Sequence, residues 1–267
     1  MPANDVSALR APLAALMREA GGIARAAASG PLKQWTKGPD RSPVCEGDIA
    51  VNDFLRGRLP LLEPGAGWLS EETADEAGAR AGATVWVVDP IDGTRAYLAG
   101  RPDWSVAVAL VHEGRPVLGA VYAPVEDAMF LAARGNGATL NDSPMKIVAN
   151  SGWAGARLAG PKRMLGAIAA RRRGVVLEPK VHSLALRLTR VAQGTLDAAF
   201  AGKGSHDWDL AAADLLVHEA GGAMTDLSGR PLTYNRSSLE HGALIAAAPA
   251  RHAELVELVR DLQPEFA

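Results

Sequence analysis

The sequence predicts a mixed α/β or α+β protein, and three observations lead to this class. Near both ends of the chain, apolar residues recur at steps of three and four, the spacing of an amphipathic helix. The middle of the chain holds short runs of β-branched and apolar residues between turn residues, which favours strands. In the last third, strand-like and helix-like runs alternate. Apolar residues make up 48% of the 267, enough for a sizeable buried core.

The N-terminal part is expected to form two helices joined by a loop. Apolar residues at helical spacing run from Val6 to Ala24, and the pair Gly30-Pro31 follows them. Residues 37–43 are rich in Gly, Pro and charged side chains and are expected to be a loop. A second helix is expected to begin near Asp48 and to be ended by Pro60 and then by Pro64-Gly65, because proline disrupts a helix interior and a Pro-Gly pair favours a turn.

The middle part is expected to form an antiparallel sheet. Residues 85–88 are a short run of buried-strand character. Residues 105–111 and 117–122 flank a Glu-Gly-Arg turn, as in a hairpin, and residues 129–132 form a further short strand.

The C-terminal part is expected to alternate strands and helices. We expect strands at 175–177, 196–200 and 244–248, and helices at 183–191, 209–219 and 249–262. The change in pattern near residues 150–157 predicts an N-terminal part, 1–150, and a C-terminal part, 151–267, which together form one compact unit.

Composition and charge exclude several classes of function. The 28 basic and 30 acidic residues give a net charge of -2, which argues against a nucleic-acid binder. The single cysteine excludes an intrachain disulfide and a thiolate zinc cluster, and it fits a reducing compartment. Neither a secretory signal nor a long apolar span is found, so we expect a cytoplasmic protein without membrane contact.

The sharpest motif is Asp-Pro-Ile-Asp-Gly-Thr at residues 89–94, directly after the predicted strand 85–88. Pro90 fixes one φ angle and Gly93 permits an unusual one, so a turn here can aim Asp89, Asp92 and a main-chain carbonyl at one point. Oxygen ligands of this kind suit Mg²⁺. A plain surface turn explains the same residues about equally well, since Asp, Pro and Gly favour turns.

Three further acidic segments lie at the ends of predicted elements. Glu71 and Glu72 follow the apolar run Trp68-Leu69, where a metal-binding role competes with a solvated strand end. Asp209 and Asp48 stand where helices are expected to begin, so each is either a metal-site or catalytic carboxylate or a simple N-cap. Carboxylates gathered in one cleft repel each other unless a cation joins them, and their placement therefore favours a metal site.

With these motifs the chain resembles the inositol monophosphatase superfamily of Mg²⁺-dependent, lithium-sensitive phosphomonoesterases. The signature at 89–94 matches without change, and Glu71-Glu72 matches the Glu-Glu element of the family. The late Trp-Asp-x-Ala-Ala and Glu-Ala-Gly-Gly elements match residues 208–212 and 219–222, and the Gly-x-Gly-Ala-x-x-Asn turn matches 135–141. The matches occur in the family's order along nearly the whole chain.

The resemblance implies a layered αβαβα sandwich, a site with two or three Mg²⁺ ions and a small phosphorylated metabolite as substrate. Relatives are often homodimers. In this family pattern Asp48 and Thr94 activate a water, and Glu72 helps to place one. The implied metal ligands are Glu71, Asp89, the Ile91 carbonyl, Asp92 and Asp209. The implied substrate contacts are Asp92, Gly93, Thr94, Ser183, Lys203 and Asp209.

The sequence departs from the inositol-specific pattern at two places. Cys45 stands where many members have threonine, and we expect it to be a small packed residue. Residues 201–205 hold no acid, but Lys203 can meet a second phosphate or remain a solvated loop lysine. The run 89–97 together with Glu71-Glu72-Thr73 looks more like the bacterial 3'(2'),5'-bisphosphate nucleotidases. Inositol monophosphate hydrolysis and a non-catalytic metal- or phosphate-binding role remain the alternatives.

Overall fold

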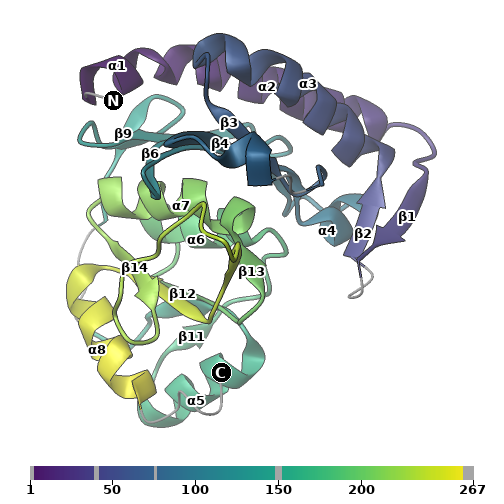
Figure 1. Cartoon of the computed structure of the whole chain (residues 1–267). Helices are drawn as coiled ribbons and strands as arrows, with labels where there is room; N and C mark the ends of the chain where they lie inside the picture. Colours follow the sequence, from purple (N-terminus) through teal and green to yellow (C-terminus); the bar gives the residue numbers. More distant parts are fainter. Residues whose placement is uncertain (1–2, 39–41, 75–76, 148–151, 261–267) are drawn as a thin grey trace.

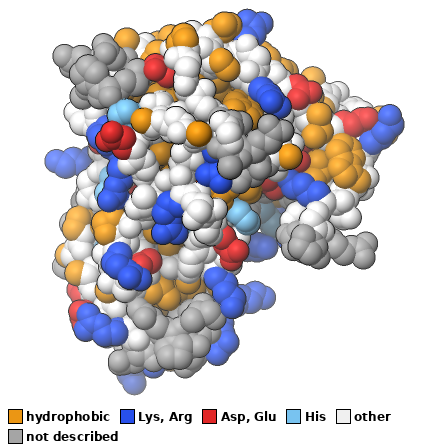
Figure 2. Space-filling view, viewed as in Figure 1, with side chains coloured by type: hydrophobic (Ala, Val, Ile, Leu, Met, Phe, Trp, Pro, Cys, Tyr) orange, Lys and Arg blue, Asp and Glu red, His pale blue; other side chains and the backbone are white. Residues whose placement is uncertain are grey.

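Five layers of secondary structure, α-β-α-β-α, make up the computed structural model, which describes residues 3–38, 42–74, 77–147 and 152–260 (Figure 1). The predicted mixed α/β class and the layered sandwich are both confirmed. Within the described residues, no helix is both long enough and apolar enough to cross a membrane. Side chains of both charge signs lie among apolar ones on the face seen in Figure 2, in keeping with the small net charge.

A seven-stranded sheet forms the first β layer, and β4 in its interior carries the main acidic motif. β3 pairs with β4 in parallel, and the other neighbours in the sheet pair antiparallel. Glu113 and Gly114 both have positive φ, at 48° and 73°, which makes the tight turn of the predicted hairpin. The strands, in spatial order, are β3 (Gly67–Ser70), β4 (Thr84–Asp92), β5 (Ser105–His112), β6 (Arg115–Ala123), β7 (Ala128–Ala133), β8 (Ala138–Leu140) and β9 (Ser143–Met145).

Three N-terminal helices cover the outer face of this sheet (Figure 1): α1 (Ala3–Ala8), α2 (Arg10–Ala27) and α3 (Glu46–Leu62). Their apolar faces pack with alternate residues of β4, β5 and β6 in one core. The second helix ends just before Pro64-Gly65, as predicted, but the expectation that Pro60 already ends it is wrong. Pro60 lies in the last turn of α3, and the helix continues to Leu62.

The middle layer consists of α6 (Leu184–Gln193) and α7 (Asp207–Glu219), which lie between the two sheets (Figure 1). α7 is buried along most of its length, and its residues share one core with both sheets. The second sheet has the order β11 (Val176–Leu177), β10 (Arg157–Ala159), β12 (Ala198–Ala201), β16 (Leu244–Ala247) and β14 (Ala223–Asp226). α5 (Lys162–Arg171) and α8 (Pro249–Arg260) pack on its outer face.

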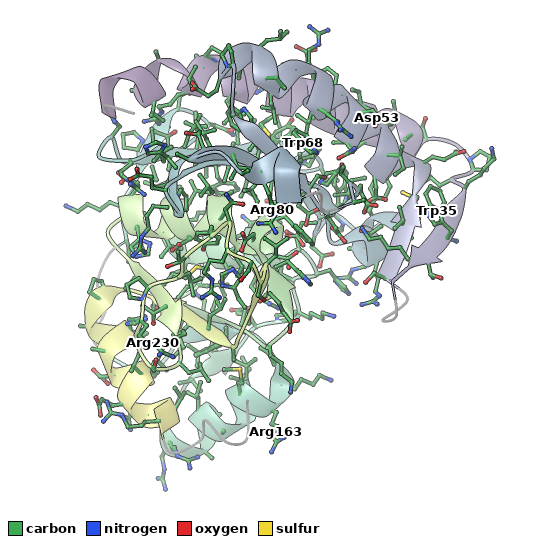
Figure 3. All side chains as sticks on the ribbon, in the orientation of Figure 1. Trp35, Asp53, Trp68, Arg80, Arg163 and Arg230 are labelled. Carbon is green, nitrogen blue, oxygen red and sulfur yellow. The ribbon has the colours of Figure 1, made fainter. Side chains whose placement is uncertain are left out.

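The expected loop at residues 37–43 differs from the structure. Its ends belong to an antiparallel pair, β1 (Gln34–Lys37) and β2 (Ser42–Cys45), while residues 39–41 lie outside the described part. The smaller elements are η1 (Ala77–Arg80), α4 (Thr94–Leu98), β13 (Ser205–His206) and β15 (Glu240–His241). Arg80 of η1 donates to the carbonyl of Arg236 at 2.9 Å, which ties the segment after Glu72 to the C-terminal half (Figure 3).

Candidate active site

The acidic motif occupies the end of β4, where the strand becomes irregular. The pairing with β5 shifts register between Asp89 and Asp92, so the two carboxylates do not simply alternate along a regular strand. Gly93 then takes φ of 91°, and a Cβ there would lie 3.0 Å from the backbone N of Ser183. Only glycine meets both conditions, and the chain can turn at once into α4.

Asp48 and Asp209 occupy equivalent positions on two different helices. Each is the third residue of its helix, α3 or α7, and not the N-cap. Oδ2 of Asp48 accepts from the backbone N of Cys45 at 2.8 Å, and Oδ2 of Asp209 accepts from the backbone N of His206 at 2.6 Å. Each carboxylate is thus fixed by the backbone before its helix, with its other oxygen left for the cleft.

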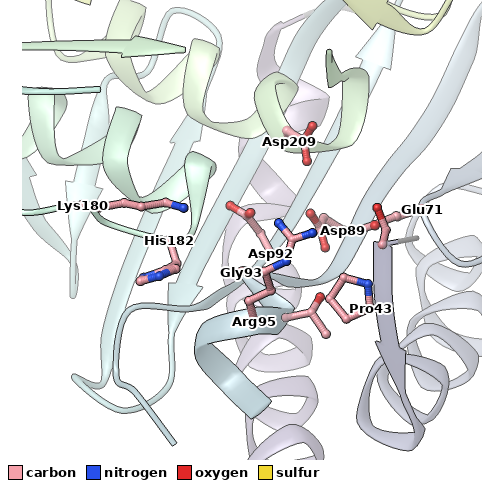
Figure 4. Close-up of a pocket in the computed structure, with 11 residues that line it drawn as sticks. Pro43, Glu71, Asp89, Asp92, Gly93, Arg95, Lys180, His182 and Asp209 are labelled. Atoms are coloured by element: carbon pink, nitrogen blue, oxygen red, sulfur yellow. The ribbon is translucent and has the colours of Figure 1, made fainter. Parts of the chain in front are cut away.

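Asp89, Asp92 and Asp209 meet in space. One carboxylate oxygen from each lies within 4.8 Å of the others. Asp89 and Asp92 are 1% and 6% exposed. Figure 4 shows Asp209 coming from α7 toward the two β4 aspartates, with Glu71 on one side at the end of β3 and Lys180 on the other.

The electrostatics of this cluster disfavour three bare carboxylates. Burial raises the pKa of Asp89 and of Asp209 well above the usual value, and repulsion from neighbouring carboxylates raises both further. Burial raises the pKa of Asp92 to about 6, although hydrogen bonds from Ser183, Ala185 and Leu184 oppose the shift. A divalent cation would remove the repulsion and keep all three groups ionised.

The donor set fits a hard divalent cation. Oδ1 of Asp89 is buried and has no hydrogen-bond partner, which is costly for a carboxylate oxygen unless a cation fills that role. All the side-chain ligands offered are carboxylate oxygens, the type that Mg²⁺ prefers. Glu71 lines the same pocket and can add a further oxygen.

Asp48 and Thr94 lie together beside this cluster. Oγ1 of Thr94 is 3.4 Å from Oδ1 of Asp48 and 3.1 Å from the carbonyl oxygen of Ile91. Cys45 is buried, and its thiol donates to Oδ2 of Asp48 at 2.9 Å, so it holds the carboxylate as well as packing. Burial raises the pKa of Asp48, which leaves it a stronger base than an exposed aspartate.

Glu72 forms an ion pair with Lys37, a residue that was not expected at the site from the sequence. Nζ of Lys37 lies 2.6 Å from Oε1 of Glu72, 3.2 Å from Oε1 of Glu71 and 2.9 Å from the Glu71 carbonyl. Burial raises the pKa of Glu72 to about 7, with the charge of Lys37 opposing the shift. No local signal predicts this contact, because it depends on the β1–β2 pair folding over the end of β3.

Part of the wall of this pocket is formed by basic residues. Arg95, Lys180 and His182 line the pocket, together with Ser42, Pro43, Gly93 and Thr94 (Figure 4). Nδ1 of His182 lies 2.7 Å from Oδ2 of Asp103, which fixes the ring. None of these three basic residues was expected at the site from the sequence. Arg95 directly follows the motif at 89–94, and Lys180 and His182 lie just before Ser183. None of the three has a recognisable motif or a regular spacing of its own.

Two expected substrate contacts lie elsewhere. Ser183 is fully buried behind Asp92, where its hydroxyl donates to Oδ2 of Asp92 at 2.6 Å and accepts from the backbone N of Leu186 at 2.9 Å. Its position supports the Asp92 carboxylate from within the protein. Lys203 is exposed between β12 and β13 and is not among the residues that line the pocket.

The sequence model of the inositol monophosphatase family matches residues 5–263. The chain is 30% identical over 245 residues to an inositol-1-monophosphatase of Mesorhizobium japonicum, covering 86% of each chain. It is 31% identical over 206 residues to a 3'(2'),5'-bisphosphate nucleotidase of Aggregatibacter actinomycetemcomitans, covering 74% of this chain and 77% of that one.

Solved structures show the same fold. The IMPase of Thermotoga maritima superposes with a TM-score of 0.82 at 26% identity, covering 95% of this chain and 97% of that one. The similarity thus extends over nearly the whole chain, and the two curated relatives differ in the substrates that their names specify.

Proposed function

Because the chain belongs to the inositol monophosphatase family, whose members are metal-dependent phosphatases, we propose that it hydrolyses a small phosphomonoester with Mg²⁺. The observation that carries the proposal is the meeting of Asp89, Asp92 and Asp209, with one buried oxygen of Asp89 lacking any partner. A purely structural cluster would satisfy that oxygen with a donor from the protein.

The chain's own residues suit phosphoryl transfer to water. Glu71, Asp89, Asp92, Asp209 and the Ile91 carbonyl would hold two or three Mg²⁺ ions. Bound Mg²⁺ supplies charge neutralisation of the phosphate and stabilisation of the leaving oxygen. Asp48 accepts the proton of the attacking water through the hydroxyl of Thr94, and Glu72 helps to place a water. Phosphoryl transfer needs mainly position and charge, which such a site provides.

We further propose a 3'(2'),5'-bisphosphate nucleotide, such as 3'-phosphoadenosine 5'-phosphate, as the preferred substrate. The support is the basic part of the pocket wall, formed by Arg95, Lys180 and His182, which line the same pocket as the carboxylates (Figure 4). One phosphate would meet the metal side while the second meets this wall. Inositol 1-phosphate, the substrate that the Mesorhizobium relative's name implies, has no second anionic group and is the alternative.

The test of the reaction is phosphate release by the purified protein with Mg²⁺. We expect release to stop with excess chelator and to fall at least ~100-fold in Asp92→Asn, because the variant loses a negative ligand at the centre of the cluster. The matched control is Asp142→Asn, the same change at an exposed residue with φ of 65°, a conformation that asparagine accepts. Full activity in Asp92→Asn would refute the assignment.

The substrate is tested by comparing kcat/KM for 3'-phosphoadenosine 5'-phosphate, inositol 1-phosphate and a sugar bisphosphate. We expect Lys180→Gln to raise KM for the nucleotide about tenfold, the loss of one charge-assisted contact, and to leave inositol 1-phosphate unaffected. Equal losses for both substrates, or a preference for inositol 1-phosphate in the wild type, would favour the alternative.

A further inference from the structure

A second pocket lies at the opposite end of α7 from Asp209. It is a hollow of about 200 Å³ lined by Arg115, Arg134, His218, Pro116, Asp214, Leu215, Glu219 and Pro231. Asp209 stands in the first turn of α7 and His218 in its last, so roughly 13 Å of helix separates them at 1.5 Å per residue. None of the residues of the candidate active site lines this hollow.

Two guanidinium groups in this pocket have no carboxylate at ion-pair distance among the residues that the structure describes. Arg115 donates to the Leu232 carbonyl at 2.8 Å, and Arg134 donates to the Pro116 carbonyl at 2.7 Å, so both use neutral acceptors. Burial lowers the pKa of Arg134 and the positive charge of Arg115 lowers it further, while the negative charges of Glu219 and Asp214 oppose the shift. Two like charges therefore lie in one hollow, with most of their N–H donors uncommitted.

The carboxylates of the pocket are engaged by other donors. The two side-chain oxygens of Glu219 accept from the backbone N of Gly135 and of Gly137, each at 2.8 Å. Oδ2 of Asp214 accepts from the hydroxyl of Tyr234 at 2.9 Å. Its buried Oδ1 has no hydrogen bond within the described part of the chain but lies 2.8 Å from Nδ1 of His218, which is hydrogen-bonded to the Asp214 carbonyl oxygen at 2.9 Å.

His218 adds a third cation on the same side of α7. The hydrogen bond to Asp214 raises the pKa of His218 and favours the protonated ring. With Arg115 and Arg134 the protonated ring gives three positive charges against the two negative charges of Asp214 and Glu219, a net positive hollow. The excess donors match the oxygens of a tetrahedral anion, which guanidinium groups bind with paired N–H contacts. The hollow has room for such an anion together with water.

We propose that Arg115, Arg134 and His218 form a binding site for an inorganic tetrahedral oxyanion of the phosphate or sulfate type, separate from the metal cluster. The site does not depend on the proposed reaction. Its residues come from the start of β6, the residue after β7 and the end of α7, so a bound anion would join the ends of two central strands of the first sheet to the middle layer.

The test is equilibrium dialysis of the full chain against radiolabelled sulfate in excess chelator. Excess chelator removes the metal ions from the first pocket, and the comparison of variants assigns the remaining binding to the second pocket. We expect the affinity for sulfate to fall at least tenfold in the double variant Arg115→Gln/Arg134→Gln. The control is Arg18→Gln/Arg56→Gln, which removes the same charge at two exposed arginines outside the pocket and should bind as the wild type does.

A second measurement locates the anion in the wild type. The imidazole resonances of His218 should shift on sulfate titration with the same midpoint as the dialysis, while those of His241, which is buried against Asp207 at the other end of α7, should not. Unchanged sulfate binding in the Arg115→Gln/Arg134→Gln variant, or an unmoved His218 resonance at saturating sulfate, would overturn the proposal. Because neither readout uses catalysis, failure here leaves the phosphatase proposal untouched.

Discussion

The Asp92 carboxylate is held in a position where it can bind a cation that the protein itself does not supply. Oδ2 of Asp92 accepts from Ser183 and from the backbone N of Ala185, both at 2.6 Å, which fixes the carboxylate firmly. Burial nevertheless raises the pKa of Asp92 and opposes its ionisation, together with the negative charge of Glu71. A fixed carboxylate group that resists ionisation binds a cation and releases protons when it does so.

This predicts how stability depends on pH. The pKa of Asp92 rises from 3.8 to about 6 on folding, so between these values the folded, metal-free protein binds more protons than the unfolded chain. Its free energy of unfolding should therefore fall as pH rises through this window. Folding lowers the pKa values of Asp103 and Asp226 from 3.8, so these two groups change the free energy of unfolding mainly below this pH window.

The measurement is urea unfolding from pH 4 to 7, with chelator and with saturating Mg²⁺. The decline should appear in chelator and should weaken with Mg²⁺, whose affinity should increase with pH through about 6. A stability that increases over this range in chelator would contradict the electrostatic picture of the cluster.

At the scale of elements, turns and helix starts bring the site together. The strand and helix runs of the middle and C-terminal parts are predictable from apolar spacing, as are the motif residues that carry carboxylates. The first turns of α3 and α7 are harder, because their N-caps are Cys45 and His206 and not the usual Ser, Thr, Asp or Asn. The β1–β2 pair escaped prediction because β1 is mostly exposed and lacks alternation.

Contacts between residues far apart in the sequence limit how much of the site can be predicted. Lys37 meets Glu72 across 35 positions of sequence, and Ser183 meets Asp92 across 91. Local propensity carries no information on such pairs, so the sequence predicts which carboxylates matter better than what surrounds them.

Gly93 gives a test at this scale. In Gly93→Ala, the positive φ and the close approach to Ser183 both oppose the new Cβ. Gly65→Ala is the matched control, since its φ is 90° but no atom lies within 4 Å of the added Cβ. We expect a loss of about 1 kcal/mol in unfolding free energy for the control and at least ~1 kcal/mol more for Gly93→Ala. Equal losses by urea denaturation would show that crowding at Gly93 is unimportant.

At the scale of the whole molecule, α7 joins the two sheets through one core. Leu216 is fully buried in a cluster that contains residues of β4, β5 and β6 as well as β12, β14 and β16. Asp209 on the same helix reaches the end of β4. We therefore propose that the parts before and after residue 150 unfold as one cooperative unit.

Leu216→Ala tests this proposal. The change should cost about 2–5 kcal/mol and lower one shared unfolding transition, seen alike by far-UV circular dichroism and tryptophan fluorescence. Leu61→Ala, at a leucine that is 72% exposed, should cost far less. Two separate transitions, with only one shifted by Leu216→Ala, would show that the parts fold independently.

Calorimetric titration of the metal-free protein with Mg²⁺ tests the convergence of the carboxylates most directly. The wild type should bind Mg²⁺, and Asp89→Asn, which replaces the buried oxygen without a partner, should bind at least tenfold more weakly while remaining folded. Equal Mg²⁺ affinity in the two proteins, or no binding by the wild type, would contradict the account.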